Sequence, residues 1–221
     1  MKEQLEQVLP EEIEKRSFEM ISEELGERVF SPWEEPIIKR CIHTSADFEY
    51  ADNLAFSEGA VQQIIEKIVQ DGVDFITDTN MGKSGVNKRA LQKMNCTVSC
   101  FMADEDVAVL AKENQTTRAV ASMDKAAQFA NNSGRAVVIA VGNAPTALVR
   151  LDELIREGKI TPALVIGVPV GFVNVVAAKE LIMEAPVPYI VAKGRKGGSN
   201  IAACICNALL YMIDNERDYW K

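Results

Sequence analysis

Two short runs of the sequence, residues 136–141 and 163–168, are apolar on both of the faces that a strand would present. Such a strand must be covered on both faces, which is the situation of a parallel sheet enclosed between two layers of helices. Longer amphipathic segments alternate with the apolar runs, and alternation of strands with helices favours the same architecture. The sequence therefore predicts an α/β fold, a three-layer α/β/α domain with a mainly parallel sheet and right-handed crossovers.

The apolar runs and the helical spacing of apolar residues together predict the order of elements. The predicted strands are residues 37–43, 74–78, 96–102, 135–141, 162–169 and 188–193. The predicted helices are residues 3–25, 57–70, 104–113, 118–131, 145–157, 173–184 and 198–216, with Ser57 as the N-cap of the second. Because no repeat, low-complexity segment or linker interrupts this pattern, we expect one domain over residues 1–221, in which residues 1–36 form an N-terminal helix and a link.

Charge and composition exclude several classes of protein. Lys and Arg total 24 against 32 Asp and Glu, a net charge of −8, which argues against binding to the phosphate backbone of nucleic acids. The first residues are charged and lack the apolar core of a secretion signal, and no apolar stretch reaches the roughly 18 residues of a membrane span. Five cysteines, an odd number, are typical of buried thiols in a cytoplasmic protein.

Polar and glycine-rich segments follow the predicted strands at the edge where open α/β sheets bind their ligands. Residues 194–199 also open a predicted helix, whose N-terminus and Arg195 could receive a carboxylate or a phosphate. A plain strand-to-helix turn remains an alternative, because the segment matches neither a Walker loop nor a dinucleotide fingerprint. The candidate binding residues at this edge are Thr79, Met81, Gly142, Asn143, Gly171, Arg195, Gly198 and Ser199.

His43 is the only histidine of the chain. A lone histidine is more often a hydrogen-bonded structural residue than a catalyst. However, His43 ends a predicted strand beside Thr44 and Ser45, and an imidazole with a pKa of about 6.5 is suited to proton transfer near neutral pH. One histidine and five scattered cysteines do not make a structural zinc site, so we expect no metal ligands, and no Gly-x-Ser-x-Gly elbow is present.

Six segments taken together resemble a known family, the precorrin-8X methylmutases (cobalt-precorrin-8 methylmutases) of corrin-ring biosynthesis. They are Ile-His-Thr-Ser-Ala-Asp-Phe-Glu-Tyr-Ala-Asp (42–52), Asp-Thr-Asn-Met (78–81), Thr-Arg (117–118), Gly-Asn-Ala-Pro-Thr-Ala-Leu (142–148), Gly-Val-Pro-Val-Gly-Phe-Val (167–173) and Gly-Arg-Lys-Gly-Gly-Ser (194–199). The resemblance implies an isomerase that moves a methyl group from C-11 to C-12 of (cobalt-)precorrin-8 and produces hydrogenobyrinate or cobyrinate.

The resemblance also implies the roles of several residues. The catalytic histidine falls on His43, and residues that contact the substrate fall on Ser17, Arg40 and Arg118. It implies a homodimer with its active sites near the subunit interface. A methyl shift within a conjugated tetrapyrrole needs no redox cofactor and no methyl donor, so we expect no cofactor, and any cobalt enters inside the substrate.

Two other functions remain open from the residues alone. A methyltransferase that uses S-adenosylmethionine would suit a Rossmann-like sheet, although no glycine-rich loop with a downstream acid follows the first predicted strand. A non-catalytic tetrapyrrole carrier would bind the product tightly without turnover. Binding of S-adenosylmethionine would identify the first of these, and absence of turnover would identify the second.

Overall fold

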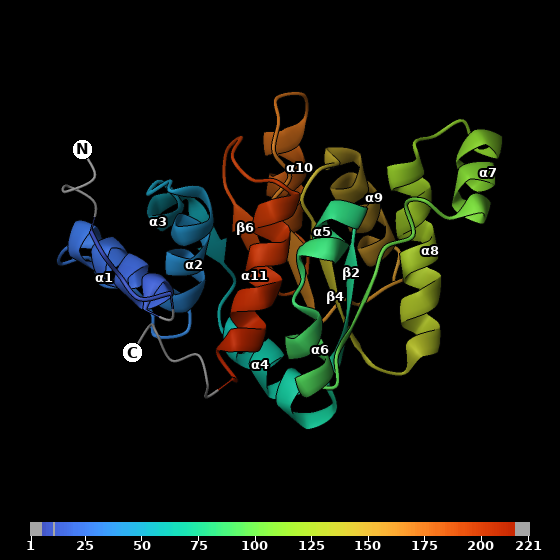
Figure 1. Cartoon of the computed structure of the whole chain (residues 1–221). Helices are drawn as coiled ribbons and strands as arrows, with labels where there is room; N and C mark the ends of the chain where they lie inside the picture. The colour runs from blue at the N-terminus through green and yellow to red at the C-terminus, as the bar shows by residue number, and fades with distance from the viewer. Residues whose placement is uncertain (1–5, 11, 215–221) are drawn as a thin grey trace.

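The computed structural model describes residues 6–10 and 12–214 of the chain. Within this part, six strands form one sheet in the order β1-β6-β5-β4-β2-β3 (Figure 1). Neighbouring strands are parallel except for β1, which is antiparallel to β6. The strands are β1 (Leu54–Phe56), β2 (Val73–Thr77), β3 (Thr97–Ser99), β4 (Ala136–Val141), β5 (Leu164–Gly167) and β6 (Tyr189–Ala192).

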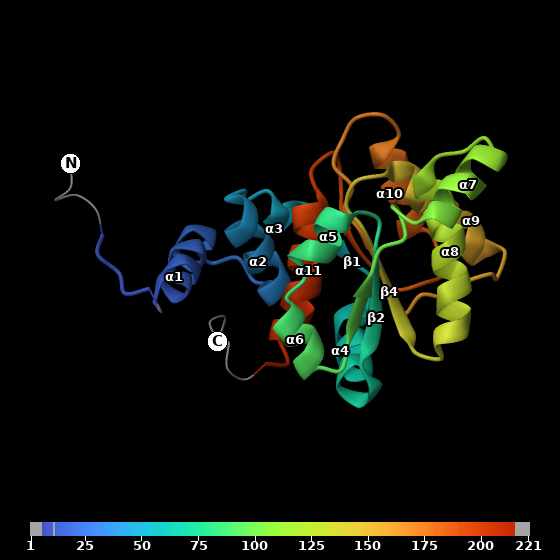
Figure 2. The same cartoon turned by 45° about the vertical axis from the view of Figure 1, so that its right-hand side comes forward.

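Helices cover both faces of this sheet. One layer contains α2 (Glu35–Ser45), α4 (Ala60–Asp71), α5 (Asn80–Gly85), α6 (Lys88–Lys93) and α11 (Ser199–Tyr211). The other contains α8 (Arg118–Ser133), α9 (Pro145–Arg156) and α10 (Val175–Met183). The short α3 (Tyr50–Asn53) follows α2, whereas α1 (Ile13–Leu25) lies at one end of the molecule and α7 (Glu105–Glu113) at the other (Figures 1 and 2).

The central strand β4 shows why the sheet needs both layers. Val138 and Ala140 belong to the hydrophobic core on the α11 side, whereas Val137 and Ile139 belong to the core on the α8 side. Successive side chains of a strand point to opposite faces, so an apolar run buries one set in each core. This arrangement confirms the predicted three-layer fold with a mainly parallel sheet.

The prediction that residues 37–43 form a strand is wrong, because these residues lie in helix α2. Pro36 is tolerated in the first turn of a helix, where its missing N–H is not needed. The buried apolar residues Ile37, Ile38, Cys41 and Ile42 follow a spacing of one, three and one, which places them on one helical face. The β-branched isoleucines suggested a strand, but burial of this face against α11 decides for a helix.

Ser57 is not the cap of a helix, contrary to the prediction. Its Oγ accepts a hydrogen bond from Tyr189 N at 2.9 Å, and its own N–H donates to Tyr189 O at 3.1 Å, so Ser57 extends the pairing of β1 with β6. Helix α4 begins at Ala60, after Gly59 at a φ of 68°. The edge strand β1 and the short helices α3, α5 and α6 were not predicted, because each is too short to show a period.

The other predicted strands and helices are present with shifted ends. The predicted helix 3–25 begins only at Ile13, and residues 3–5 lie outside the described part of the chain. The predicted helix 198–216 ends at Tyr211, and residues 215–216 also lie outside that part. All five cysteines are buried free thiols, as expected. Among the described helices, none is long and apolar enough to cross a membrane.

Candidate active site

The carboxyl end of strand β2 is joined to that of β4 through the carboxylate of Asp78. Its Oδ1 accepts the N–H of Gly142 at 2.9 Å, and its Oδ2 accepts those of Asn143 and Ala144 at 2.8 and 2.9 Å. Burial raises the pKa of Asp78, and the three N–H donors act in the opposite direction by stabilising the carboxylate. This contact fixes the turn between β4 and α9.

The N-terminus of α11 lies against the same turn. The hydroxyl of Thr79, which also accepts Gly82 N–H as the cap of α5, lies 2.7 Å from the hydroxyl of Ser199. A side chain on Gly142 would place its Cβ 2.6 Å from Ser199 Cα, closer than real atoms approach. The absence of a side chain at Gly142 is therefore what allows α11 to begin here.

The loop of residues 194–198 brings Arg195 to this edge of the sheet. Arg195 O accepts the N–H of Gly171 at 3.1 Å, and the N–H of Gly198 donates to Val168 O at 2.8 Å. The guanidinium carbon of Arg195 lies 5.3 Å from the ring centroid of Phe172, within the range of a cation–π contact. The loops after β5 and β6 are thus held together by backbone hydrogen bonds.

Several large apolar side chains at this edge are exposed. Phe172 and Val173, in the loop after β5, are 79% and 78% exposed, and Met81, in the first turn of α5, is 70% exposed. Exposed apolar side chains beside a helix N-terminus and an arginine could contact a ligand that is apolar at its centre and anionic at its rim. The predicted residues Thr79, Met81, Gly142, Asn143, Gly171, Arg195, Gly198 and Ser199 all lie along this edge, which we name the sheet-edge group.

A second group lies between α1 and α2. The imidazole of His43, in the last turn of α2, stacks on the ring of Phe18 with centroids 5.2 Å apart and planes 12° apart. His43 and Ser17 line an open cavity of about 300 Å³, whose other lining residues are Met20, Ile21, Glu24, Ile42, Ala46 and Phe48. Partial desolvation lowers the pKa of His43, and the nearby Arg40 guanidinium lowers it further.

Arg40 lies on the buried side of this helix pair. Its guanidinium carbon is 4.6 Å from the centroid of Phe18 and 5.3 Å from that of Tyr211, and it forms an ion pair with Glu14. The position of His43 differs from the prediction, because His43 lies in the last turn of a helix and not at the end of a strand. Ser17, Arg40 and His43, which we name the helix-pair group, therefore lie together but not on the edge of the sheet.

An ion pair connects the two groups. The Nζ of Lys196 lies 2.6 Å from Asp47 Oδ2 and 2.9 Å from Glu49 Oε2, and Asp47 is four residues beyond His43. The hydroxyl of Thr44 also donates to Cys204 Sγ of α11 at 3.1 Å. The segment that follows His43 and the loop that carries Arg195 are therefore neighbours, and one large ligand could contact both.

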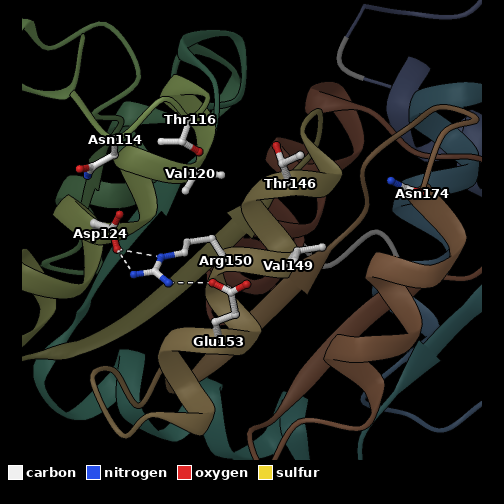
Figure 3. Close-up of a pocket in the computed structure, with 9 residues that line it drawn as sticks. All are labelled: Asn114, Thr116, Val120, Asp124, Thr146, Val149, Arg150, Glu153 and Asn174. Carbon is white, nitrogen blue, oxygen red and sulfur yellow. Dashed lines mark hydrogen bonds and ion pairs between the residues drawn. The ribbon is translucent and has the colours of Figure 1, made fainter. Parts of the chain in front are cut away.

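Arg118 lies on a further element, α8, that carries no member of either group. It is exposed at the start of α8, after Thr117, whose hydroxyl accepts Val120 N–H. The nearby cavity between α8 and α9, of about 470 Å³, contains Arg150, but its guanidinium is held by Asp124 at 2.7 Å and by Glu153 at 2.7 Å (Figure 3). Since these carboxylates neutralise Arg150, that cavity offers no unpaired charge to an anion.

Sequence reasoning missed three side chains that shape the site. Asp78 could have been predicted, because a charged residue directly after an apolar strand indicates a buried carboxylate. Phe18 and Phe172 had no signal, because an aromatic residue in a helix or a loop is most often core. Over residues 6–10 and 12–214, no cluster of three or more His, Cys, Asp or Glu side chains has the arrangement of metal ligands.

Comparison with known proteins gives a consistent result. A family model described as precorrin-8X methylmutase matches residues 12–212. A protein of Priestia megaterium named cobalt-precorrin-8 methylmutase is 42% identical over 212 residues, covering 96% of this chain and 92% of its own. One of the same name from Salmonella typhimurium is 42% identical over 210 residues, covering 92% and 96%.

Solved structures agree in fold. The structure described as precorrin-8x methyl mutase from Thermus thermophilus superposes with a TM-score of 0.83 at 40% identity, covering 93% of this chain and 99% of its own. A second, described as a precorrin-8X methylmutase related protein, gives a TM-score of 0.77 at 30% identity and covers 89% and 100%. The similarity therefore extends over nearly the whole chain in both sequence and structure.

Proposed function

The chain belongs to the precorrin-8X methylmutase family and is an isomerase of cobalamin biosynthesis, and from this premise we propose the step that it catalyses. It moves the methyl group from C-11 to C-12 of precorrin-8 or its cobalt form, with His43 as the acid/base. The observation that carries the assignment to His43 is its imidazole, which is exposed, stacked on Phe18 and open to the cavity beside Ser17.

The methyl shift is an intramolecular [1,5]-sigmatropic rearrangement of the conjugated ring. The bond from C-11 to the methyl carbon breaks as the bond to C-12 forms, so the reaction needs no electron acceptor and no methyl donor. A proton that His43 donates to the ring and then recovers leaves the balance unchanged. General acid–base catalysis of this kind contributes about 10²–10⁴-fold, and the rest must come from positioning and electrostatics.

The protonation state of His43 depends on the bound substrate. In the free protein, desolvation and Arg40 lower the pKa of His43, so its imidazole is mostly neutral at pH 7. A polycarboxylate that binds beside it favours the imidazolium, because a nearby negative charge raises the pKa of a base. Substrate binding then loads the proton that the reaction uses.

The carboxylates around the rim of the substrate need cationic or N–H partners. We assign this role to Arg195 and the N-terminus of α11 at Gly198 and Ser199, with Arg118 as an outer contact. The buried Arg40, which is paired with Glu14, contributes positive charge beside His43. The exposed Met81 and Phe172 supply apolar contacts to the macrocycle. A net charge of −8 does not prevent this binding, because the groups that line a site, and not the net charge of the chain, set the local field there.

The cobalt form is the proposed natural substrate. Relatives named cobalt-precorrin-8 methylmutase are 35–42% identical to this chain, and two named precorrin-8X methylmutase are 35% and 33% identical. In this proposal cobalt belongs to the substrate, and the protein uses no cofactor of its own.

We further propose that the protein is a cytoplasmic homodimer. The half-exposed apolar residues Ile13 and Met20 on α1 support the dimer, and sedimentation of the purified protein tests it.

Anaerobic visible spectroscopy tests the proposed reaction. Methyl migration changes the conjugated path of the macrocycle and therefore its colour. The protein should convert many equivalents of cobalt-precorrin-8, and convert it faster than metal-free precorrin-8. A spectral change that stops at one equivalent would instead indicate a non-catalytic carrier, and faster conversion of the metal-free form would overturn the assignment of the cobalt substrate.

A further inference from the structure

A buried lysine lies beneath the loop that carries Arg195. Lys179 belongs to α10 and is 1% exposed, the lowest exposure of any lysine among the described residues. Its Nζ donates to the carbonyl of Gly194 at 2.9 Å and to the carbonyl of Lys196 at 2.8 Å. The two carbonyls flank Arg195, so one ammonium group fastens the backbone on both sides of that residue.

Burying this amine costs stability, so folding alone does not explain why a lysine occupies this position. Burial lowers the pKa of Lys179 to about 8, because the ammonium ion is poorly solvated inside the protein. Its two acceptors belong to a surface loop, where backbone carbonyls normally bond to water. An apolar residue would fill the space beneath the loop without a charge, so the structure retains the lysine at a cost in stability.

Other contacts complete the hold on the loop. Arg195 O accepts the N–H of Gly171, so the backbone on both sides of Arg195 and the carbonyl of Arg195 itself are all hydrogen-bonded. At the end of the loop, Gly198 N–H donates to Val168 O, directly before α11. With its backbone fixed, Arg195 holds its guanidinium over Phe172, on the open side of the sheet edge.

We propose that Lys179 is a positioning residue that aligns Arg195 and the N-terminus of α11 to receive a carboxylate of the substrate. This inference rests on the proposed function, since it specifies how that substrate is held. Lys179 itself does not touch the substrate: it is buried, and it directs two of its N–H groups to the loop. Its removal should therefore weaken substrate binding and leave the methyl shift itself nearly unchanged.

The test compares Lys179→Met with a matched control. Methionine retains the apolar length of lysine but lacks the N–H donors and the charge. In Lys179→Met, amide hydrogen exchange over residues 193–200 should rise by about tenfold, because the loop opens more often. The KM for cobalt-precorrin-8 should rise by about tenfold, the scale of a small misplacement of a binding group, whereas kcat stays within about threefold.

The control is Lys193→Met, which removes a charge from the exposed residue next to the loop and breaks no hydrogen bond to it. It should leave both the exchange and the KM as in the wild type. An unchanged exchange rate in Lys179→Met, a loss of kcat without a rise in KM, or an equal effect of Lys193→Met would overturn the inference. If Lys179→Met does not fold, Lys179→Gln is used, which keeps an N–H₂ donor on a shorter side chain. It should raise the exchange rate and the KM by a smaller factor than about ten, and unchanged values of both would overturn the inference.

The two proposals fail in different ways. If the wild-type protein does not convert cobalt-precorrin-8, the proposed function is wrong, while hydrogen exchange still reports whether Lys179 holds the loop. If the wild type turns over and exchange in Lys179→Met is normal, only the role of Lys179 is wrong.

Discussion

The sheet-edge group and the helix-pair group reach the same candidate site by different physical means. At the sheet edge, backbone N–H groups and one buried carboxylate fix the turns, as in the three hydrogen bonds to Asp78. In the helix pair, aromatic packing sets the geometry, with Phe18 in contact with both His43 and Arg40. Hydrogen-bonded turns give a rigid frame for binding, whereas a stacked, exposed imidazole is free to exchange a proton.

The difference between the two groups predicts different effects of mutations on stability, KM and turnover. Changes at the sheet edge should affect stability and KM together, because the same backbone contacts support both. Changes at His43 should affect turnover alone, because its exposed side chain contributes little to folding. The four predictions below test this separation, from the largest expected effect to the smallest.

His43→Ala should lower kcat by about 10²–10⁴-fold, the usual contribution of a general acid or base. The melting temperature should change by less than about 3 °C, because an exposed side chain is removed. Turnover of cobalt-precorrin-8 and calorimetry of the same preparation measure the two effects. Turnover at the wild-type rate would remove His43 from the mechanism, and a collapse of the fold would remove the contrast between the groups.

Gly142→Ala should disturb both stability and binding. Its Cβ would meet Ser199 Cα at 2.6 Å and Gly198 O at 2.8 Å, and these backbone atoms cannot rotate away. We expect a loss of about 1–3 kcal/mol in the free energy of unfolding, the usual cost of overpacking, together with a rise in KM. Denaturant titration and steady-state kinetics measure the two quantities.

The control for this variant is Gly158→Ala. Gly158 has a φ of 69° and no heavy atom within 4 Å of a Cβ built on it, so alanine there adds backbone strain without a clash. It should lower stability and leave the KM unchanged. A Gly142→Ala protein with normal KM would show that the start of α11 is not part of the binding site.

Asp78→Asn should separate the charge of this residue from its shape. The amide can present only one acceptor oxygen, so at least one of the three N–H groups loses its partner or faces an N–H₂ group. We expect a loss of about 1–3 kcal/mol in the free energy of unfolding, the cost of an unsatisfied buried group, and a kcat near that of the wild type. A large fall in kcat at unchanged stability would instead place Asp78 in the chemistry.

The pH dependence of kcat/KM gives the smallest and most specific test. The pKa of His43 in the free protein lies below the ordinary histidine value, so the imidazolium fraction is small at pH 7 and grows as the pH falls. If the imidazolium donates the proton, kcat/KM of the wild type should rise as the pH falls toward that pKa. The slope should be absent in His43→Ala, and a slope that persists there would assign the proton to another group.

The sequence predicted the sheet edge well and the helix pair poorly, for a physical reason. Strands such as β4 are apolar at every position, so their ends can be recognised in the sequence. The polar residues that follow them must lie at the carboxyl edge of the sheet. Residues 37–43 contain adjacent isoleucines that favour a strand locally, and only tertiary packing against α11 selects the helix. The neighbourhood of Ser17, Arg40 and His43 was accessible through family resemblance, not through any pattern in the residues themselves.

The capping of helix ends decides where an anion can enter without competition. The start of α5 is occupied by the hydroxyl of Thr79, the start of α8 by that of Thr117, and the turn before α9 by the carboxylate of Asp78. Helix α11 begins at Ser199, and the residue before it, Gly198, has no side chain to act as a cap. The start of α10, after Asn174, also lacks a side-chain cap. An incoming carboxylate at the start of α11 would therefore meet backbone N–H groups that no capping side chain occupies.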